Sequence, residues 1–252
     1  MAVIAHLSDI HIDAEPRSLD RARAVMDYLN ALPADLDAVV VTGDIADHGL
    51  PDEYERAREL LRSRHPVLTC PGNHDERAAF REFLLGLPGS TAPVNQVHHA
   101  DGFTLALCDS SVPGKGEGFL GDETLEWLED VLTRSRVGIP VLVGFHHPPV
   151  PLHTPYVDGI RQFGEDRLAA LADRHPDLLA FLCGHAHTPA ATTFAGRPLL
   201  VAPGVVSTLR LPWEHQDHPA HHVHLDLPPA VAFHVLDEPT GRLTTHYRTV
   251  PC

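Results

Sequence analysis

One segment constrains the fold of this chain more than any other, an apolar run that is followed closely by Gly43 and Asp44. The run covers residues 38–41 and predicts a buried strand, with Asp44 at its C-terminal end. Ligand sites in α/β sheets lie at the carboxyl ends of strands. A carboxylate there can bridge two cations if other hard or imidazole ligands converge on it. The sequence should then contain other strands that end in such ligands.

Four further apolar runs end in ligand-capable residues. Asp9 and His11 are two positions apart, so on an extended backbone they face the same side. A single histidine after a strand is more often an ordinary core or surface residue, but seven polar residues at five strand ends form a pattern. The candidate metal ligands are therefore Asp9, His11, Asp44, Asn73, His146, His185 and His187.

The order of the elements indicates an α/β fold. Strand-like runs alternate with helical patterns, such as the one over residues 18–32, where apolar residues recur at helical spacing. This alternation predicts a mainly parallel sheet with crossover helices. From about residue 190 the pattern becomes short, mostly antiparallel strands, and we expect residues 1–252 to form one domain.

Composition excludes several classes of function. The net charge is −15, which argues against affinity for nucleic acid backbones and anionic membranes. No apolar run approaches the roughly 18 residues that a membrane span needs, and the N-terminus lacks the basic start of a signal peptide. The four cysteines are scattered, which suits buried thiols in a reducing compartment. We expect a cytoplasmic protein without membrane or nucleic acid partners.

The 20 histidines leave alternatives open. His147 could replace His146 as the ligand, although neighbouring residues point to opposite sides of an extended chain. His98 and His99 could line a substrate pocket, but ordinary surface histidines are more common. A run near the C-terminus lacks carboxylates and cysteines at ligand spacing and predicts a solvated loop, with substrate contact as the exception. This run is His215, His218, His221, His222 and His224.

The ordered motifs of the chain resemble those of the calcineurin-like metallophosphoesterase superfamily. These motifs are Asp9-x-His11, Gly43-Asp44-x-x-Asp47, Gly72-Asn73-His74-Asp75, His146 and Gly184-His185-x-His187. The closer resemblance is to class III cyclic-nucleotide phosphodiesterases and bacterial glycerophosphodiesterases, and it rests on residues 72–77 and 146–149. The resemblance implies a four-layer α/β/β/α sandwich of two mixed sheets, with metals at the C-terminal strand edges.

The resemblance also implies two metal ions. One would be held by Asp9, His11, Asp44 and His187, and the other by Asp44, Asn73, His146 and His185. Mixed oxygen and nitrogen ligands suit Mn²⁺, Fe or Zn²⁺. The first site has two carboxylates, whereas the second has only the shared one and a neutral amide. We therefore expect the second metal to bind more weakly.

Catalytic roles follow from the same resemblance. Two cations about 4 Å apart can clamp a phosphoryl oxygen and lower the pKa of a bridging water, which then attacks phosphorus in line. His74 would supply a proton to the leaving alkoxide, and Asp47 would hydrogen-bond and orient His74. The alternative for Asp47 is that it only caps a turn. Asp75 would either orient His74 or, as we expect, begin the next helix. Arg77 would contact substrate or cap the helix that it opens.

The expected reaction is hydrolysis of a small phosphodiester. Phosphoprotein phosphatases of the superfamily carry an Arg where this chain has His48. Arg grips a phosphate dianion in a bidentate manner, whereas a diester monoanion needs less clamping. The first candidate substrates are 3′,5′-cyclic nucleotides such as cyclic AMP, and the alternative is a glycerophosphodiester or another small diester. A non-catalytic scaffold of the same fold is the less favoured alternative, and a homodimer is possible.

Overall fold

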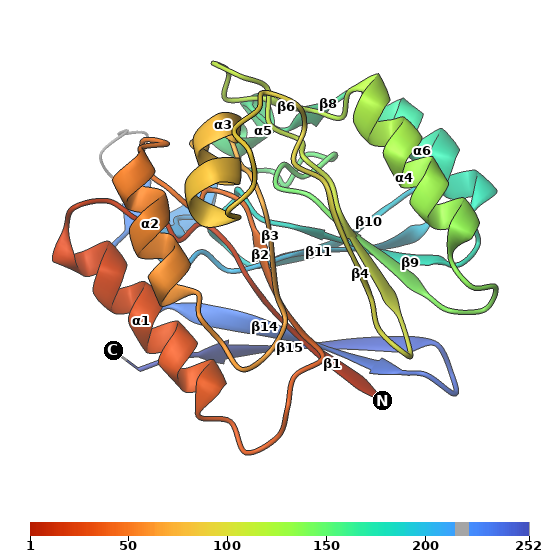
Figure 1. The fold of residues 1–252 in the computed structure, drawn as a ribbon, viewed down its shortest axis with the longest axis horizontal. Helices are drawn as coiled ribbons and strands as arrows, with labels where there is room; N and C mark the ends of the chain where they lie inside the picture. The colour runs from red at the N-terminus through yellow and green to blue at the C-terminus, as the bar shows by residue number, and fades with distance from the viewer. Residues whose placement is uncertain (215–221, 252) are drawn as a thin grey trace.

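Two mixed β-sheets form the centre of the computed structural model, which describes residues 1–214 and 222–251 (Figure 1). The first sheet has the strand order β15-β14-β1-β2-β3, and the second has the order β10-β11-β9-β7-β5-β4. The first sheet consists of β1 (Ala2–Leu7), β2 (Ala38–Thr42), β3 (Val67–Cys70), β14 (Ala230–Asp237) and β15 (Arg242–Thr249). The second consists of β4 (Gln96–His99), β5 (Thr104–Leu107), β7 (Val141–Gly144), β9 (Leu178–Cys183), β10 (Ala190–Phe194) and β11 (Arg197–Val201).

Two short strand pairs and several helices complete the fold. The pairs are β6 (Gly118–Phe119) with β8 (Gln162–Phe163), and β12 (Thr208–Leu209) with β13 (Val223–His224). The helices are α1 (Pro16–Asn30), α2 (Pro51–Leu60), α3 (Arg77–Ala79), η1 (Phe80–Leu84), α4 (Asp122–Arg134), α5 (Pro155–Gly159), α6 (Glu165–Arg174) and η2 (Pro212–Glu214). Both α1 and α2 begin at a proline, whose fixed φ suits the first helical position. No helix within the described ranges is both long and apolar enough to cross a membrane.

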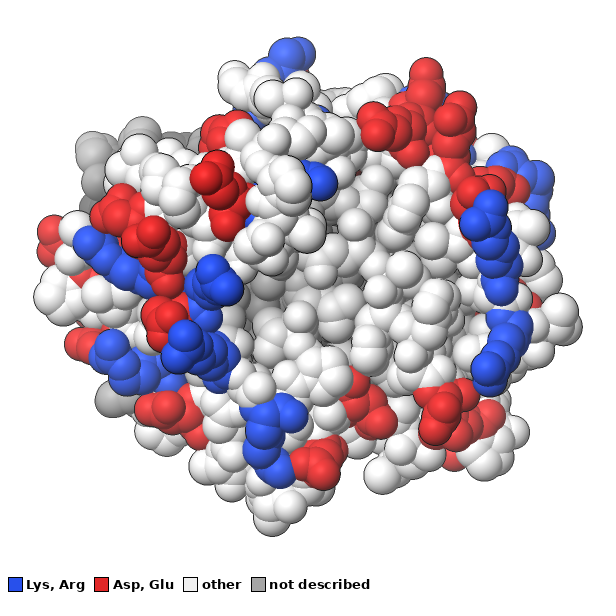
Figure 2. All heavy atoms as spheres, viewed as in Figure 1, with Lys and Arg blue, Asp and Glu red and all other residues white. Residues whose placement is uncertain are grey.

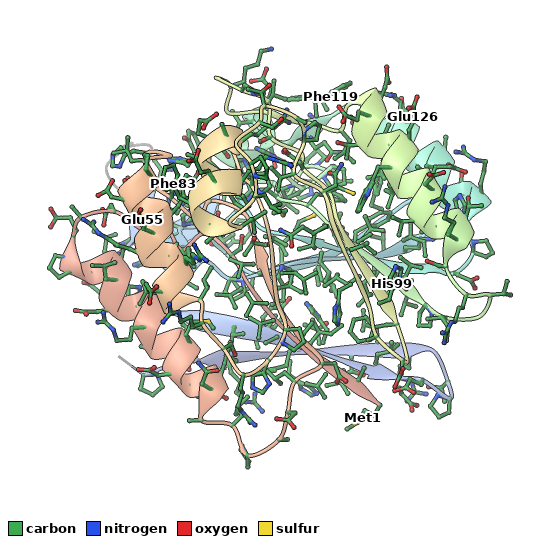
Figure 3. The ribbon with its side chains drawn as sticks, viewed as in Figure 1. Met1, Glu55, Phe83, His99, Phe119 and Glu126 are labelled. Atoms are coloured by element: carbon green, nitrogen blue, oxygen red, sulfur yellow. The ribbon has the colours of Figure 1, made fainter. Side chains whose placement is uncertain are left out.

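Three apolar clusters separate four layers. One packs α1 and α2 on the first sheet, with Val25, Leu29 and Val41 fully or almost fully buried. A second lies between the sheets, and a third packs α4 and α6 on the second sheet. Side chains from both sheets fill the space between them (Figure 3). The predicted α/β/β/α sandwich of two mixed sheets is confirmed.

Strand direction brings the candidate ligands to one edge. β1, β2 and β3 are parallel, as are β5, β7, β9 and β11, so their carboxyl ends meet on the same side. β14 and β15 extend the first sheet in antiparallel pairing, as the C-terminal pattern predicts. β4 and β5 form an antiparallel hairpin at one edge of the second sheet. After β3 the chain forms the short α-helix α3, which continues directly as the π-helix η1.

Candidate metal centre

The backbone is left-handed at five of the seven candidate ligands. Non-glycine residues rarely adopt positive φ, and each such residue costs on the order of 1–3 kcal/mol. The five are Asp9 (φ 55°), His11 (φ 42°), Asp44 (φ 49°), His185 (φ 69°) and His187 (φ 54°). Such strain persists only where the surrounding structure determines the conformation, and it concentrates at functional sites. The sharp turns at the strand ends therefore mark the site independently of the side chains.

Backbone hydrogen bonds and two glycines hold these turns. The amide of Asp9 donates to the carbonyl of Gly43 at 3.1 Å, and the amide of His11 donates to the carbonyl of Asp44 at 2.9 Å. Gly43 has φ +85°, and a Cβ there would collide with the ring of His146. A Cβ on Gly72 would collide with Asp44. The close approach of the neighbouring loops thus needs glycine at both positions.

The carboxylate of Asp44 lies between two groups of ligands. Its Oδ2 is 3.5 Å from Nε2 of His11 on one side and 3.4 Å from Nε2 of His146 on the other. Beside His11, Nε2 of His187 lies 3.3 Å from Nε2 of His11 and 3.5 Å from Oδ1 of Asp9. Asp44 therefore has the position of a shared ligand.

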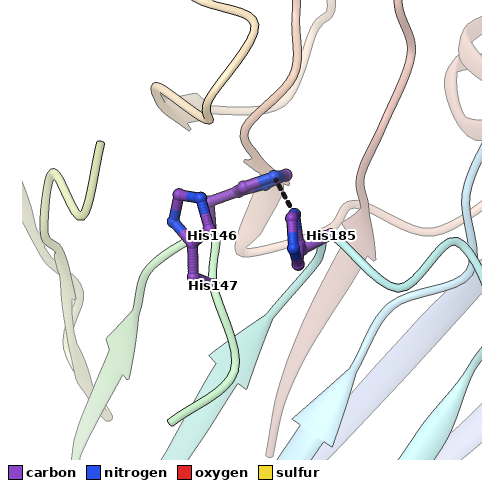
Figure 4. Close-up of side chains that lie close together, drawn as sticks. All are labelled: His146, His147 and His185. Carbon is purple, nitrogen blue, oxygen red and sulfur yellow. Dashed lines mark hydrogen bonds between the residues drawn. The ribbon is translucent and has the colours of Figure 1, made fainter. Parts of the chain in front are cut away.

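The second group is completed by His185. Its Nδ1 lies 3.2 Å from Nε2 of His146 (Figure 4), and its amide donates to Oδ2 of Asp9 at 3.1 Å. The amide of His74, the residue after Asn73, donates to Oδ1 of Asp44 at 3.0 Å. The structure thus brings all the candidate ligand segments to one place.

Three histidines have their Nδ1 engaged outside the centre. Nδ1 of His11 donates to Asp47 at 2.8 Å, and Nδ1 of His146 donates to the carbonyl of Thr42 at 2.6 Å. Nδ1 of His187 is 2.8 Å from the hydroxyl of Ser207. Such partners fix the ring orientation of ligand histidines and leave Nε2 for the metal. Ser207 had no signal in the sequence, because it follows no ligand motif.

The donor set fits metal ions. Among the described residues, Oδ1 of Asp9, Oδ1 of Asn73 and Nε2 of His185 are buried and have no hydrogen-bond partner. Buried polar atoms are nearly always paired, so three unpaired ligand atoms in one place need a partner that protein atoms do not supply. A bound cation provides that partner, and carboxylate, amide and imidazole donors together suit Mn²⁺, Fe or Zn²⁺.

Electrostatics in the cluster favour an ionised carboxylate at Asp44 and neutral imidazoles at His185 and His187. For His11 and His146 burial lowers the pKa, but the surrounding groups, carboxylates above all, raise it by more, to about 9 for His146. Burial alone would raise the pKa of Asp44, but His146 and His11 lower it well below its usual range. Burial, followed by the neighbouring His146, lowers the pKa of His185 well below its usual range, and burial also lowers the pKa of His187. Neutral imidazole is the form that binds metal, so both side chains are ready to act as ligands.

The contact of Asp47 differs from the expected one. Its carboxylate accepts a hydrogen bond from His11 and lies 3.7 Å from Nδ1 of His74. The main-chain carbonyl of Asp47 instead accepts from Nδ1 of His74, at 2.8 Å. His74 is 41% exposed. The orientation of His74 therefore comes from the backbone of Asp47, while its carboxylate supports a candidate ligand.

Asp75 has neither of the two roles considered for it. Its carboxylate accepts hydrogen bonds from the amides of Ile45 (3.1 Å), Ala46 (3.0 Å) and Gly72 (2.8 Å), and from the hydroxyl of Tyr54 (3.0 Å). The next helix begins at Arg77 with Glu76 as its N-cap, so the expectation that Asp75 begins it is wrong. Asp75 instead holds the turn that follows Asp44.

Hydrogen bonding distinguishes His146 from His147 as candidate ligands, although both belong to a group of three histidines that could hold a metal ion. Nε2 of His147 donates to the carbonyl of Gly116 at 3.2 Å, and its Nδ1 is 2.8 Å from the hydroxyl of Ser110. Both ring nitrogens of His147 are thus engaged by protein atoms. The structure places His146, rather than His147, against Asp44, although the three rings of Figure 4 lie close together.

Arg77 is engaged elsewhere, and His98 and His99 lie away from the centre. Arg77 donates to the carbonyl of Ser111 at 2.7 Å and pairs with Asp109 at 2.8 Å, so it braces a neighbouring loop. His98 and His99 lie at the end of β4, opposite the start of β5. The candidate ligands follow the carboxyl ends of the parallel strands, so these two histidines lie at the opposite end of the second sheet. In the histidine-rich segment, His215, His218 and His221 lie outside the described residues, and His224 lies in β13.

A model of calcineurin-like phosphoesterases matches residues 2–189, a stretch that contains all seven candidate ligands. The chain belongs to the calcineurin-like phosphoesterase family. The resemblance noted in the sequence is thereby confirmed. Family membership, together with the phosphodiesterase names of curated relatives, supports a hydrolase that acts on phosphodiesters, and the family implies two metal ions.

Curated relatives of this phosphoesterase carry two kinds of name. The glycerophosphodiester phosphodiesterase GpdQ of Enterobacter lignolyticus is 37% identical over 227 residues, which cover 85% of this chain and 81% of that protein. A probable cyclic nucleotide phosphodiesterase of Rhodococcus erythropolis is 35% identical over 214 residues, covering 79% and 69%. Among solved structures, a dimetal phosphatase from Danio rerio superposes with a TM-score of 0.72 at 17% identity, covering 98% and 96%, and supports the fold.

Proposed function

We propose that this phosphoesterase hydrolyses small phosphodiesters at a dinuclear metal centre, with 3′,5′-cyclic nucleotides as first candidates. The observation that carries the proposal is the carboxylate of Asp44, which lies within 3.5 Å of Nε2 of both His11 and His146. One metal would be held by Asp9, His11, Asp44 and His187, and the other by Asp44, Asn73, His146 and His185. The donor set suits Mn, Fe or Zn.

When bound, two such ions polarise a phosphoryl group and activate a water molecule. The chain's own contribution is to orient the groups and to move a proton. The carbonyl of Asp47 holds the Nδ1 proton of His74, so Nε2 of His74 carries the transferable proton. In its imidazolium form His74 would give that proton to the leaving alkoxide, as a general acid does.

A diester fits the charge around the centre better than a phosphate dianion. His48 occupies the position of the superfamily's phosphate-gripping Arg, and its Nδ1 is tied to Glu53 at 2.8 Å. Glu53 and then Asp47 raise the pKa of His48, and its imidazole lacks the bidentate fork of an Arg. Basic side chains on the face drawn in Figure 2 are interspersed with acidic ones and form no continuous band there, which suits a small substrate over a nucleic acid backbone.

A glycerophosphodiester is the second candidate substrate, because the GpdQ relative is the more similar of the two curated relatives described above and is matched over more of its length. Both candidates present a monoanionic phosphodiester to the same centre. They differ in the leaving group. It is a ribose hydroxyl oxygen in a cyclic nucleotide, and the oxygen of glycerol or of another alcohol in a glycerophosphodiester. The predicted cytoplasmic location and homodimer stay predictions.

The deciding experiment is a substrate panel on protein reconstituted with Mn²⁺. The panel compares cyclic AMP, glycerophosphoethanolamine, bis(p-nitrophenyl) phosphate and the monoester p-nitrophenyl phosphate, with Asp44→Asn as the variant that should lose all activities together. We expect diesters to be turned over faster than the monoester, and cyclic AMP faster than the other diesters. Cyclic AMP turnover no better than that of unrelated diesters would remove the first candidate. Failure to hydrolyse bis(p-nitrophenyl) phosphate would favour the scaffold alternative.

A further inference from the structure

A row of four polar side chains lies along the inner face of the first sheet, beside the apolar layer between the two sheets. It runs over adjacent strands from Thr245 in β15 through His234 in β14 and His6 in β1 to Thr42 in β2. Thr245 and His234 are direct cross-strand partners, while each of the other two steps joins diagonal neighbours, which long side chains can span. Both histidines are fully buried. We call these four residues the polar row.

Hydrogen bonds join the polar row from end to end. The distance from Oγ1 of Thr245 to Nδ1 of His234 is 2.8 Å, and from Nε2 of His234 to Nδ1 of His6 it is 3.0 Å. The last bond joins Nε2 of His6 to Oγ1 of Thr42 at 2.9 Å. Every ring nitrogen of the two histidines thus has a partner, as buried polar groups require.

Proton positions in the polar row follow from the burial of its two ends. Each neutral imidazole has one donor and one acceptor nitrogen, so all the bonds must run in the same direction. Thr42 is fully buried and Thr245 is partly exposed. If the hydroxyl of Thr42 donates to His6, then His6 donates to His234 and His234 donates to Thr245. The hydroxyl proton of Thr245 is then the one proton of the row without an acceptor in it, and water can accept that proton because Thr245 is partly exposed. The row therefore donates outward, from Thr42 to Thr245.

The inner end of the polar row lies beside the candidate metal centre. Thr42 is the last residue of β2, two positions before Asp44. Its carbonyl accepts the Nδ1 proton of His146 at 2.6 Å and the hydroxyl proton of Ser8 at 2.7 Å. One residue thus binds the polar row through its side chain and a candidate ligand through its main chain.

We propose that His6 and His234 are positioning residues for the metal held by His146, acting through Thr42. The polar row ties the end of β2 to β1 and β14, and this keeps the carbonyl of Thr42 aimed at Nδ1 of His146. Packing alone does not require such a row, because apolar side chains would fill an apolar layer without desolvating two imidazoles. This inference rests on the proposed dinuclear centre and adds residues to its support.

The test is a titration of metal-free protein with Mn²⁺, followed calorimetrically and independent of hydrolysis. Thr42→Val keeps the shape of the side chain and the carbonyl but removes the bond to His6. We expect the weaker of two binding steps to lose about 10- to 100-fold in affinity, the usual effect of removing an outer partner of a ligand, and the tighter step to change less than about threefold. Thr245→Val is the matched control, because it cuts the same row at its other end.

The control separates positioning from stability. We expect Thr245→Val to lower the melting temperature about as much as Thr42→Val while leaving both affinities within about threefold. Equal loss of affinity in both variants, or unchanged affinity in Thr42→Val, would overturn the inference. If Thr42→Val does not fold, the double variant His6→Leu/His234→Leu decides, because it leaves no unpaired ring nitrogen. It must weaken the same step, and wild-type affinity in it would also overturn the inference.

The wild-type titration separates the two proposals. A wild-type protein that binds fewer than two Mn²⁺ ions contradicts the dinuclear centre and the positioning role with it. Two binding steps in the wild type, with no effect of Thr42→Val, contradict only the positioning role.

Discussion

The buried pair His6 and His234 should make metal-free protein sensitive to mild acid. Burial lowers the pKa of His234 to about 3, and burial together with His234 lowers the pKa of His6 well below its usual value. In the unfolded chain an imidazole has a pKa of about 6.5. Below that pH the unfolded chain takes up protons that the folded chain does not, so stability falls as the pH falls from about 6.5 toward 3.

The magnitude for His234 follows from its pKa. At pH 5 the imidazole in the unfolded chain is about 1.5 pH units below its pKa, whereas at pH 7 it is mostly neutral. At 1.36 kcal/mol per unit, its protonation stabilises the unfolded chain by about 2 kcal/mol between these two pH values. Burial lowers the pKa of His11 and His146, but the neighbouring groups, carboxylates above all, together raise it by more, so both histidines contribute with the opposite sign. The quantity to compare is therefore the cost of His234→Leu at the two pH values, not the stability of the wild type alone.

Urea denaturation in EDTA measures this cost. His234→Leu leaves Nδ1 of His6 without a partner, so it should destabilise the protein at pH 7 by about 1–3 kcal/mol. At pH 5 the cost should be smaller by about 2 kcal/mol, because the variant no longer carries the group that the unfolded chain protonates. His246→Leu, which removes an exposed histidine from the same hairpin, is the control substitution, measured at both pH values. An equal cost of His234→Leu at pH 7 and pH 5 would refute the reasoning.

Three further predictions concern the centre. His74→Ala should keep both metals and slow the hydrolysis of diesters with poor leaving groups by about 10²- to 10⁴-fold, which is the usual contribution of a general acid. Unchanged turnover of such a diester would exclude that role. Asp47→Asn should lower the affinity for the metal held by His11 by about 10- to 100-fold, because the carboxylate of Asp47 accepts the Nδ1 proton of His11. A metal titration checks this, and a smaller loss of affinity in Asp47→Asn than in His74→Ala would contradict the contact. Tyr54→Phe should cost about 1–2 kcal/mol of stability, measured by urea denaturation, and Asp75→Ala should cost more, because it also leaves three backbone amides without their acceptor.

The sequence predicted the layout of the fold and the set of candidate ligands for a clear physical reason. Parallel strands place their carboxyl ends together, so residues directly after apolar runs had to meet, and Asp44 does lie between His11 and His146. The short strand-like runs after about residue 190 also predicted the change to antiparallel strands near the C-terminus.

The support of the site could not be predicted in the same way. Whether the carboxylate of Asp47 contacts His11 or His74 depends on differences of about 1 Å between side chains from separate loops. Asp75 stood next to His74 in the sequence, but its partners are backbone amides of another turn. His6 sat within an apolar run, and only the pairing of β1 with β14 shows that it meets His234.

The left-handed backbone at five candidate ligands has a consequence for engineering this protein. Glycine adopts positive φ at little cost, so replacing Asp9, His11, Asp44, His185 or His187 with glycine relieves local strain while it deletes a ligand. A directed-evolution campaign that selects for heat resistance in a chelating buffer would therefore enrich variants without a centre. Selection in the presence of added metal reverses that bias, because each bound ion then stabilises only the chains that retain its ligands.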